Sequence, residues 1–397
     1  MYIKQFFIDL KLNICFVCKW LWIAFALGIV CGIVGALFHI SIDYVTDFRL
    51  SHSWIVWGLP IGGVCIVYLY RLVHLSHEPG TNTIIQSIRQ QEKVPVLLAP
   101  AIFLATIITH LFGGSSGREG AALQIGGSLA TSFGKIIHAD QREMSMLIMC
   151  GMSAVFSALF GTPLTATLFS MEVVSVGVFY YAALVPCLCS SLISFGIAQL
   201  FGCQPTFYQL SIPFQLTPIM SLKLAVFAFI IAAFSIVFVL MMHYSHKCFH
   251  QYFHNPYIRV IIGSFMLMIL VFFFQQRYLG AGMEIVAEAL YHQALPYDFF
   301  MKAIFTAITI GCGFKGGEIV PTFVIGSTLG YVSALLLGID PHLGAAIGIV
   351  GMFCCVINSP LTSLMLGAEM FGIQYLTAMA IVVALCYVLS GYLSLYQ

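Results

Sequence analysis

The chain has 397 residues, of which 60% are hydrophobic and only 8% are charged, and its formal net charge is +1. Charged residues make up about a quarter of an ordinary soluble domain, so this composition excludes one, and the small net charge gives no indication of a nucleic-acid partner. We therefore predict an all-α polytopic membrane protein, with one membrane domain over residues 1–397 and no cytoplasmic accessory domain.

The chain begins with a basic segment that carries Lys4, Lys11 and Lys19. The apolar run that follows is longer than the core of a secretory signal and lacks a small-residue cleavage site, so this segment is predicted to remain in the mature protein. Lysines flanking a first span favour the cytoplasmic side, which places the N-terminus there.

Apolar runs of about the length that crosses a bilayer follow along the chain. They lie at 20–42, 53–70, 94–112, 178–200, 219–243 and 258–276. From 300 to 397 the chain is apolar almost throughout, and glycine and proline rather than charge divide it. This pattern predicts many helices, several of them short, tilted or broken.

Two glycine-rich breaks, each with one glutamate, interrupt these apolar stretches. The first reads GGSSGREGAALQIGG around Glu119, and the second reads GCGFKGGEIVPTFVIG around Glu318, 199 positions later. A carboxylate inside a membrane costs roughly 2.5 to 3.5 kcal/mol on insertion scales, so its usual role is functional. Both glutamates are therefore candidate site residues.

A second pair of motifs indicates an internal duplication. The segment FGTPLTA at 160–166 corresponds to INSPLTS at 357–363, and a hydroxyl residue precedes the proline in both. This order predicts an N-cap followed by proline in the first helical turn. Glu172 and Glu369 each follow their proline by nine residues and are predicted to be structural. We predict two inverted repeats, at approximately 20–200 and 219–397.

Inverted repeats place a substrate site near the bilayer midplane, where broken helices present their N-terminal ends. These ends carry unpaired N–H groups and partial positive charge, which favour an anion. A third break, from Glu78 to Asn82, could add another N-terminus. A carboxylate beside such a site competes with the anion when ionised and vacates the site when protonated, which couples anion movement to proton movement.

Two other groups of side chains, the cysteines and a cluster of histidines, are not predicted to form functional sites. Cys15 and Cys18 form the only CxxC in the chain, and the cysteines are predicted to be small buried hydrophobic residues rather than metal ligands. The histidines between His243 and His254 are predicted to lie in a solvated loop, with a pH sensor or metal site as the alternative. No metal or other cofactor is predicted.

Three stretches together resemble the CLC anion transporter superfamily: GREG with a glutamine four residues after its last glycine, GTPLTATLFSMEV, and GFKGGEIVPTFVIGSTLG. The resemblance runs from about residue 25 to the C-terminus. It implies the CLC-type inverted-repeat fold and a homodimer with one pathway per subunit.

Carried over by position, the resemblance implies that Glu119 is the gating glutamate and that Glu318 is a second acidic group on the pathway. Arg118 would orient the loop rather than bind substrate. The implied anion-binding positions are Gly80, Thr81, Asn82, Gly120, Val320 and Tyr396, with Tyr392 as a second candidate for the tyrosine.

Within the superfamily the chain resembles the fluoride/proton antiporter branch. Ala121 stands where chloride-type members usually have proline, and Val173 stands where chloride/proton antiporters usually have a second glutamate. Lys315-Gly316-Gly317-Glu318 is similar to a stretch typical of the fluoride branch. Thr81 and Val320 depart from that branch, which commonly has a methionine and a threonine at these positions.

The sequence therefore predicts a transporter rather than an enzyme, located in a bacterial cytoplasmic membrane and exporting fluoride in exchange for protons. A chloride or general halide exchanger and a passive channel of the same fold remain alternatives. A cation/proton exchanger would place its acidic groups at helix C-termini, and an intramembrane enzyme would need a nucleophile and base, for which no constellation is present.

Overall fold

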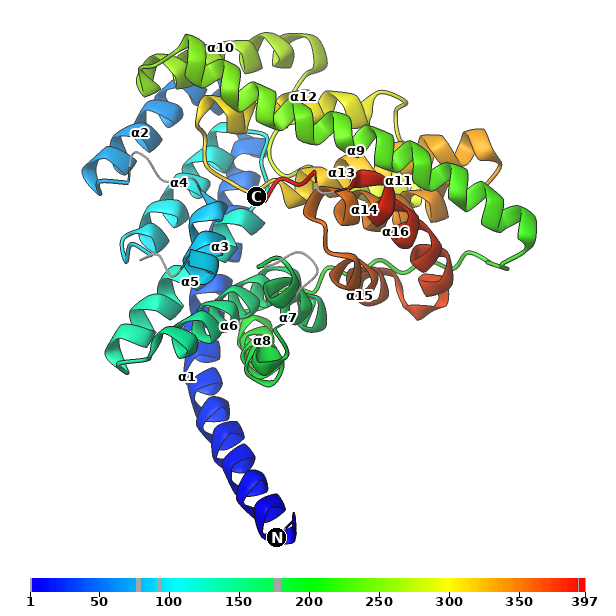
Figure 1. The fold of residues 1–397 in the computed structure, drawn as a ribbon. Helices are drawn as coiled ribbons and strands as arrows, with labels where there is room; N and C mark the ends of the chain where they lie inside the picture. Colours follow the sequence, from blue (N-terminus) through cyan, green and yellow to red (C-terminus); the bar gives the residue numbers. More distant parts are fainter. Residues whose placement is uncertain (1, 76–79, 91–93, 175–179, 392, 397) are drawn as a thin grey trace.

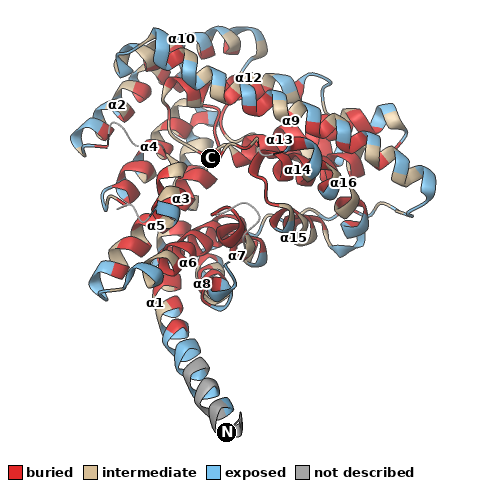
Figure 2. Cartoon of the chain, in the orientation of Figure 1, coloured by how far each residue is buried: buried red, intermediate tan, exposed pale blue. Residues whose placement is uncertain are grey.

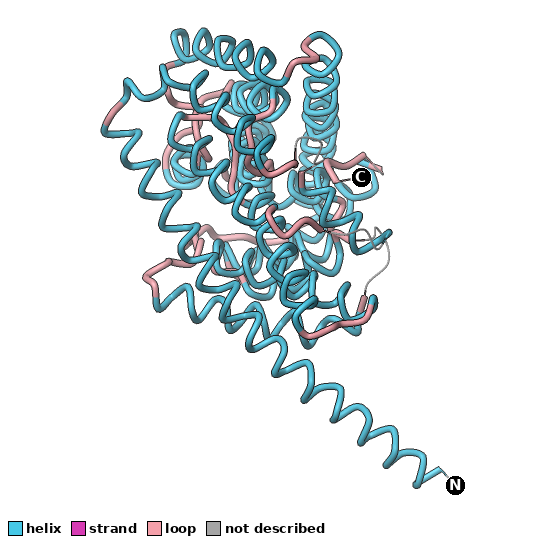
Figure 3. The backbone as a smooth tube through the Cα atoms, turned by 90° about the vertical axis from the view of Figure 1, so that its left-hand side faces the viewer, coloured by secondary structure: helices cyan, strands magenta, loops and turns pink. Residues whose placement is uncertain are grey.

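A computed structural model describes all residues except 1, 76–79, 91–93, 175–179, 392 and 397. Within the described residues the chain is mainly helical, and a longer non-helical connection at 201–217 joins α8 to α9 (Figures 1 and 3). The first half contains α1 (Tyr2–Ser51), α2 (Leu59–Leu72), α3 (Thr81–Gln90), α4 (Leu98–Phe112), α5 (Glu119–Ile136), α6 (Gln141–Phe160), α7 (Pro163–Glu172) and α8 (Leu184–Leu200).

The second half repeats much of this order. It contains α9 (Pro218–Tyr252), α10 (Pro256–Phe274), α11 (Met283–Tyr291), α12 (Asp298–Cys312), α13 (Ile319–Leu337), α14 (Pro341–Ile357), α15 (Pro360–Phe371) and α16 (Leu376–Ser390). Short 3-10 turns lie at η1 (Ser53–Gly58), η2 (Tyr181–Ala183) and η3 (Ile373–Tyr375). Eight segments of the described chain are long and apolar enough to cross a membrane, and α4 and α14 are shorter apolar helices.

The centre of the fold consists of two pairs of tightly packed helices, α5 with α6 and α13 with α14. Buried residues cover α6 and α13, whereas the outer helices α1 and α10 expose much of their surface (Figure 2). An ideal Cβ on Gly126 would lie 2.2 Å from the carbonyl oxygen of Gly151, and one on Gly326 would lie 2.6 Å from that of Gly348. Small residues therefore let both pairs approach closely, at corresponding places in the two halves.

The helix α7 receives its N-terminal cap from the other half of the molecule. Both carboxylate oxygens of Glu369, on α15, accept hydrogen bonds there: Oε1 from the backbone N–H of Leu164 at 3.0 Å and Oε2 from that of Thr165 at 2.8 Å. The Thr165 hydroxyl also donates to Oε2, at 2.6 Å. A carboxylate at a helix N-terminus satisfies N–H groups that the helix itself leaves unpaired.

The reverse exchange caps α15 in the same way. Glu172, the last residue of α7, accepts from the N–H groups of Leu361 and Thr362 at 3.1 and 2.8 Å and from the Thr362 hydroxyl at 2.6 Å. The structural role predicted for both glutamates agrees with these bonds. The predicted positions of the prolines are also correct, because Pro163 and Pro360 begin α7 and α15.

The predicted hydroxyl caps are wrong. Thr162 and Ser359 occupy the N-cap positions, but neither side chain caps its helix, and both hydroxyl oxygens are buried without a hydrogen-bond partner among the described residues. The glutamate from the opposite half takes the N–H groups that each hydroxyl was expected to bind.

Two further predictions need correction. His243, His246 and His250 lie on the long helix α9 rather than in a loop, whereas His254 follows the end of that helix as predicted. The rings of His246 and His250 stack with centroids 4.2 Å apart. Cys15 and Cys18 are exposed on α1, because that helix begins at Tyr2, well before the apolar run that starts at residue 20. No group of metal-ligating side chains forms among the described residues.

We predict that Glu369→Ala lowers the free energy of unfolding by about 2 to 4 kcal/mol, because it removes three charge-assisted hydrogen bonds and leaves the N–H and hydroxyl of the buried Thr165 without their acceptor. The shift in the midpoint of denaturant unfolding in detergent measures the loss. Asp47→Ala is the control, since it removes an exposed carboxylate from α1. Equal midpoints for the two variants would contradict the capping role.

Candidate functional site

The two glycine breaks lie against each other at the centre of the molecule. The N–H of Gly117 donates to the carbonyl of Gly317 at 2.6 Å, and the N–H of Gly317 donates back to the carbonyl of Gly117 at 2.7 Å. Each break opens at a glycine in the left-handed region, Gly113 at φ +90° and Gly313 at φ +115°, which ends the preceding helix. The helices that follow, α5 and α13, therefore start beside one another.

Glu119 is the first residue of α5 and is fully buried. Its carboxylate oxygen Oε2 accepts a hydrogen bond at 3.2 Å from the backbone N–H of Val320, in the first turn of α13. The other oxygen, Oε1, has no hydrogen-bond partner among the described residues. The carboxylate thus occupies the N-terminus of a helix from the opposite half, the kind of position that binds free anions in other proteins.

Gly120 brings a third helix to the same place. An ideal Cβ on this residue would lie 2.9 Å from the hydroxyl oxygen of Thr81, 3.2 Å from the Cα of Gly317 and 3.3 Å from the carbonyl oxygen of Gly316. Thr81 begins α3 and is buried. The N-termini of α3, α5 and α13 therefore converge, and glycine is required because no side chain fits between them.

The structure describes some of the other predicted residues of the break before α3. Gly80 has φ +73°, which turns the chain into α3, and the side-chain oxygen of Asn82 is buried without a hydrogen-bond partner in the described chain. Glu78 and Pro79, which belong to the same predicted break, lie outside the described residues.

Glu318 occupies the N-cap of α13 and is partly exposed. Its Oε2 atom has no hydrogen-bond partner among the residues that the structure describes. Glu318 is close enough to Glu119 for the two carboxylates to interact electrostatically. The Lys315 ammonium lies over the ring of Tyr70, 4.6 Å from its centroid.

Tyr396 closes the site from the C-terminal end of the chain, which lies between the two halves (Figure 1). It is 6% exposed, and its hydroxyl lies near the Thr81 side chain but has no hydrogen bond of regular geometry within the described part of the chain. The N–H of Leu395 donates to the carbonyl of Val356 at 3.0 Å, which holds this segment against α14. Tyr392, the second candidate, lies outside the described residues.

Arg118 forms an ion pair with α1. Its Nη1 atom is 2.9 Å from a carboxylate oxygen of Asp43 on α1, and the other oxygen of Asp43 is 3.0 Å from the ring of His39. The prediction that Arg118 orients the loop is consistent with this contact, and its partner lies 75 positions earlier in the chain, where no local pattern indicated it.

Two neighbours of the site were not predicted as site residues. The side-chain amide of Gln124 donates to the carbonyl of Gly120 at 3.1 Å and lies 3.4 Å from the Thr81 hydroxyl, so it supports the start of α5. Ser116 is fully buried in the first break, and its hydroxyl has no hydrogen-bond partner among the residues that the structure describes. Gln124 could have been identified from its place four residues after Gly120, on the same face of the helix.

Chemically, the site combines helix N-termini with carboxylates and a tyrosine. Polar atoms without a hydrogen-bond partner among the described residues gather here from four segments: the Asn82 carbonyl oxygen, one carboxylate oxygen each of Glu119 and Glu318, and the Tyr396 hydroxyl. Buried polar groups normally have partners, so this concentration indicates a position for a ligand or water. Donors at the helix ends suit a small anion, and the carboxylates can hold protons.

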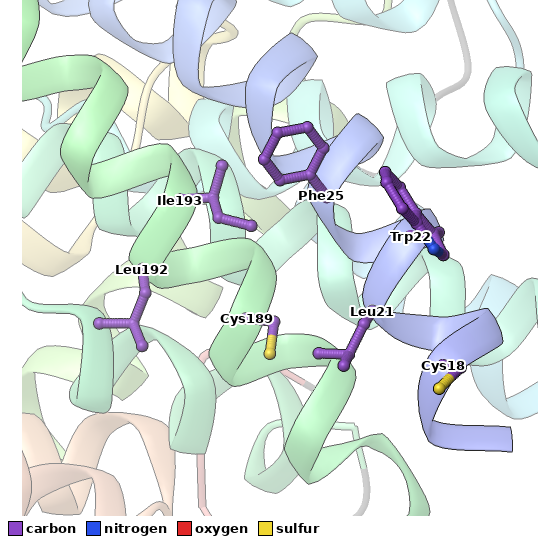
Figure 4. Close-up of a pocket in the computed structure, with 7 residues that line it drawn as sticks. All are labelled: Cys18, Leu21, Trp22, Phe25, Cys189, Leu192 and Ile193. Carbon is purple, nitrogen blue, oxygen red and sulfur yellow. The ribbon is translucent and has the colours of Figure 1, made fainter. Parts of the chain in front are cut away.

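A separate hollow lies between α1 and α8 and has a different character (Figure 4). It is lined by Cys18, Leu21, Trp22, Phe25, Cys189, Leu192 and Ile193. These side chains are apolar, and several are largely exposed on the outer surface of the helices. The hollow therefore faces the surroundings of the protein and contributes nothing to the site.

Comparisons with known proteins agree with this geometry. The sequence profile of the family described as voltage gated chloride channel matches residues 62–391. A chloride/fluoride channel protein of Pseudomonas syringae pv. tomato is 31% identical over 392 residues, covering 96% of this chain and 86% of the relative.

Solved structures give the same result. The crystal structure of a CLC-type fluoride/proton antiporter superposes with a TM-score of 0.92 at 33% identity, covering 96% of this chain and 97% of the other. A slow cyanobacterial Cl⁻/H⁺ antiporter shares the fold, with a TM-score of 0.79 at 18% identity and 94% of both chains covered. The predicted CLC-type fold is confirmed.

The contact between the breaks generates a steric prediction. An ideal Cβ on Gly317 would lie 2.6 Å from the backbone nitrogen of Gly120, so Gly317→Ala should force the helix starts apart and lower the free energy of unfolding by about 1 to 3 kcal/mol. Gly196→Ala on α8 is the control, because its Cβ would meet nothing within 4 Å. A Gly317→Ala variant as stable as this control, by denaturant unfolding, would contradict the proximity of the breaks.

Proposed function

This chain belongs to the CLC family of anion channels and transporters, and on that premise we propose that it is a secondary active transporter that exchanges fluoride for protons. One observation carries the proposal. The buried carboxylate of Glu119 takes a hydrogen bond from the N-terminus of α13, where an anion would bind, and retains one oxygen without a partner among the described residues.

Competition between the Glu119 carboxylate and the anion for the N-terminus of α13 couples anion movement to proton movement. Ionised Glu119 is itself an anion and holds the Val320 N–H. When the carboxylate is protonated, it loses the charge that the helix end attracts, so a free anion displaces it. The displaced side chain carries its proton away from the site. Each passage of an anion therefore requires a proton on Glu119.

Glu318 is the second acidic group in this proposal. It lies at the start of α13, near Glu119, with an unpartnered oxygen, and can pass protons to and from the gating position. Glu172 is unsuitable for this role, because both of its oxygens cap α15. Its neighbour is Val173, which cannot carry a proton.

Fluoride as the substrate rests on the density of hydrogen-bond donors. Fluoride is small and strongly hydrated, so a site must replace its water with many N–H and O–H groups. The N-termini of α3, α5 and α13 supply N–H groups, and Tyr396 supplies a buried hydroxyl. The names of the relative and of the solved structure that share about a third of this sequence include fluoride.

One observation favours a broader substrate range. Val320 lies in the first turn of α13, beside Glu119, and its apolar side chain offers no hydroxyl to replace water around fluoride. A less selective site would also accept chloride. A general halide/proton exchanger is therefore the second candidate, and a passive anion channel is the third.

The membrane, the assembly and the direction of transport are also part of the proposed function. We place the protein in a bacterial cytoplasmic membrane, since the 31% identical relative is bacterial and eight described segments can span a bilayer. A homodimer with one pathway per subunit is the expected assembly. Fluoride export driven by inward proton movement is the expected direction, because cells benefit from removing a toxic anion.

Flux through purified protein in liposomes tests the proposal. Vesicles loaded with fluoride should release it with matching proton uptake, and chloride should move at least about tenfold more slowly, equivalent to about 1.4 kcal/mol of discrimination. Glu119→Gln should abolish the proton movement, whereas the control Asp47→Asn, at an exposed position on α1, should preserve it. A fluoride electrode and an internal pH dye measure the two fluxes.

Three other results would change the proposed function. Equal rates for chloride would replace fluoride export with general halide exchange. Anion flux without proton movement in the unmodified protein would make it a channel. Proton coupling that survives in Glu119→Gln would remove Glu119 from the gating role.

A further inference from the structure

His39 and Asp43 lie one turn apart on α1 and form a short chain of contacts that ends at Arg118. The Nε2 atom of His39 is 3.0 Å from Oδ2 of Asp43, and Nη1 of Arg118 is 2.9 Å from Oδ1 of the same carboxylate. Arg118 immediately precedes Glu119 in the chain. The three side chains therefore connect α1 to the residue before the proposed gating glutamate.

Both nitrogens of the His39 ring face hydrogen-bond acceptors. Nδ1 lies 3.2 Å from the backbone carbonyl oxygen of Leu159, near the end of α6, and Nε2 faces the Asp43 carboxylate. A carbonyl oxygen and an ionised carboxylate only accept, whereas a neutral imidazole carries a single N–H and can donate to one of them. The protonated, positively charged ring is the form that makes both hydrogen bonds together.

The exposure of these side chains favours a positioning role over a stabilising one. The side chains of His39 and Arg118 are 12% and 16% exposed, whereas that of Asp43 is 55% exposed. An ion pair with a carboxylate that is open on one side contributes little to the stability of a fold. The contacts with Asp43 therefore matter mainly for where they hold Arg118.

The place of Arg118 controls where the Glu119 carboxylate lies. Arg118 is the N-cap residue of α5, and its carbonyl accepts from the N–H of Ala122 at 3.0 Å. On its other side, Gly117 is bound to Gly317 by the paired backbone hydrogen bonds. An ideal Cβ on Gly117 would lie 2.1 Å from Oε2 of Glu119, so the carboxylate folds back over this short segment. A shift of Arg118 relative to α1 would move the carboxylate relative to the N-terminus of α13.

Other titratable groups near these contacts come from two further segments. Arg118 acts on the buried ring of His110, on α4, and on the Cys203 thiol, in the segment after α8, and Asp43 also acts on Cys203. Within the described residues, His39 and Arg118 are the ion-pair partners of Asp43. Histidine is the side chain whose charge ordinarily changes between about pH 5 and 8, so His39 makes this arrangement sensitive to pH.

We propose that His39 and Asp43 are positioning residues for Glu119, and that they hold Arg118, and with it the first glycine break, while His39 is protonated. Loss of the His39 proton removes one of the two hydrogen bonds of its ring, so α1 holds Arg118 less firmly. The inference rests on the proposed function, because it concerns the group that gates exchange. Protons then act on exchange through His39 as well as through Glu119 and Glu318.

The pH profile of fluoride efflux from liposomes that contain the full chain tests this role. Between about pH 6 and pH 8 the rate should fall about fivefold further in the unmodified protein than in His39→Gln, since one net hydrogen bond changes an equilibrium by about this factor. Glutamine carries its donors at one position and cannot serve both acceptors at either pH. His254→Gln, which removes an exposed histidine after α9, should keep the profile of the unmodified protein.

Substitution of Asp43 separates positioning from packing. Asp43→Asn keeps the shape of the side chain but has one acceptor oxygen, which His39 and Arg118 cannot share as they share the carboxylate. The number of protons moved per fluoride should fall in this variant, at an unchanged unfolding midpoint, and Asp43→Glu should restore it. Asp47→Asn removes an exposed carboxylate one turn further along α1 and should change neither quantity.

Solid-state ¹⁵N spectra of histidine-labelled protein in the same liposomes give a readout that does not depend on transport. The signals of His39 are those that disappear in His39→Gln. Both ring nitrogens of His39 should be protonated at about pH 6, and one of them should lose its proton by about pH 8.

Three results would overturn the positioning role. One is a His39 ring with a single protonated nitrogen at both pH values, and another is the same pH profile in His39→Gln as in the unmodified protein. The third is a joint loss of rate and unfolding midpoint in Asp43→Asn at an unchanged ratio of protons to fluoride, which would assign Asp43 to packing. If the unmodified protein exchanges chloride instead of fluoride, the profile is measured with chloride, and the expected profile and spectra would then support the positioning role while the fluoride assignment fails.

Discussion

The paired hydrogen bonds between Gly117 and Gly317 are the constraint on which the rest of the site depends. They join the two glycine breaks, one from each half of the molecule, at 2.6 and 2.7 Å. Because each break immediately precedes a helix, the contact makes α5 and α13 begin side by side in the interior. A third helix, α3, reaches the same place because Gly120 has no side chain. Unpaired N–H groups of three helices thus converge at one place.

The second organising feature is that glutamates of each half accept hydrogen bonds from helices of the other half. Glu172 and Glu369 each cap a helix of the opposite half through three hydrogen bonds, and Glu119 also reaches across, to Val320. Glu119 differs in the number of its bonds: one oxygen takes a single backbone N–H from the opposite half, and the other has no partner in the described chain. The fully bonded glutamates are suited to hold the fold together, whereas the weakly held one can leave its place.

Much of the fold could be predicted from the sequence, because its main signals are local. Apolar runs, glycine breaks and prolines at helix starts depend on neighbouring residues, and they located α7 and α15 correctly. Contacts between distant segments could not be predicted. Ser359 has the local features of a capping residue, yet a glutamate from the opposite half takes that role. The partner of Arg118 likewise depends on tertiary packing, which leaves no pattern in the sequence.

The central claim is that the Glu119 carboxylate and the transported anion compete for the same helix ends. Titration of weakly buffered purified protein with sodium fluoride, with pH recorded throughout, tests this competition most directly. If the claim is correct, fluoride binding draws protons from solution in the unmodified protein, and Glu119→Gln binds fluoride without this proton uptake. Fluoride binding with no proton uptake in the unmodified protein, or equal uptake in both proteins, would contradict it.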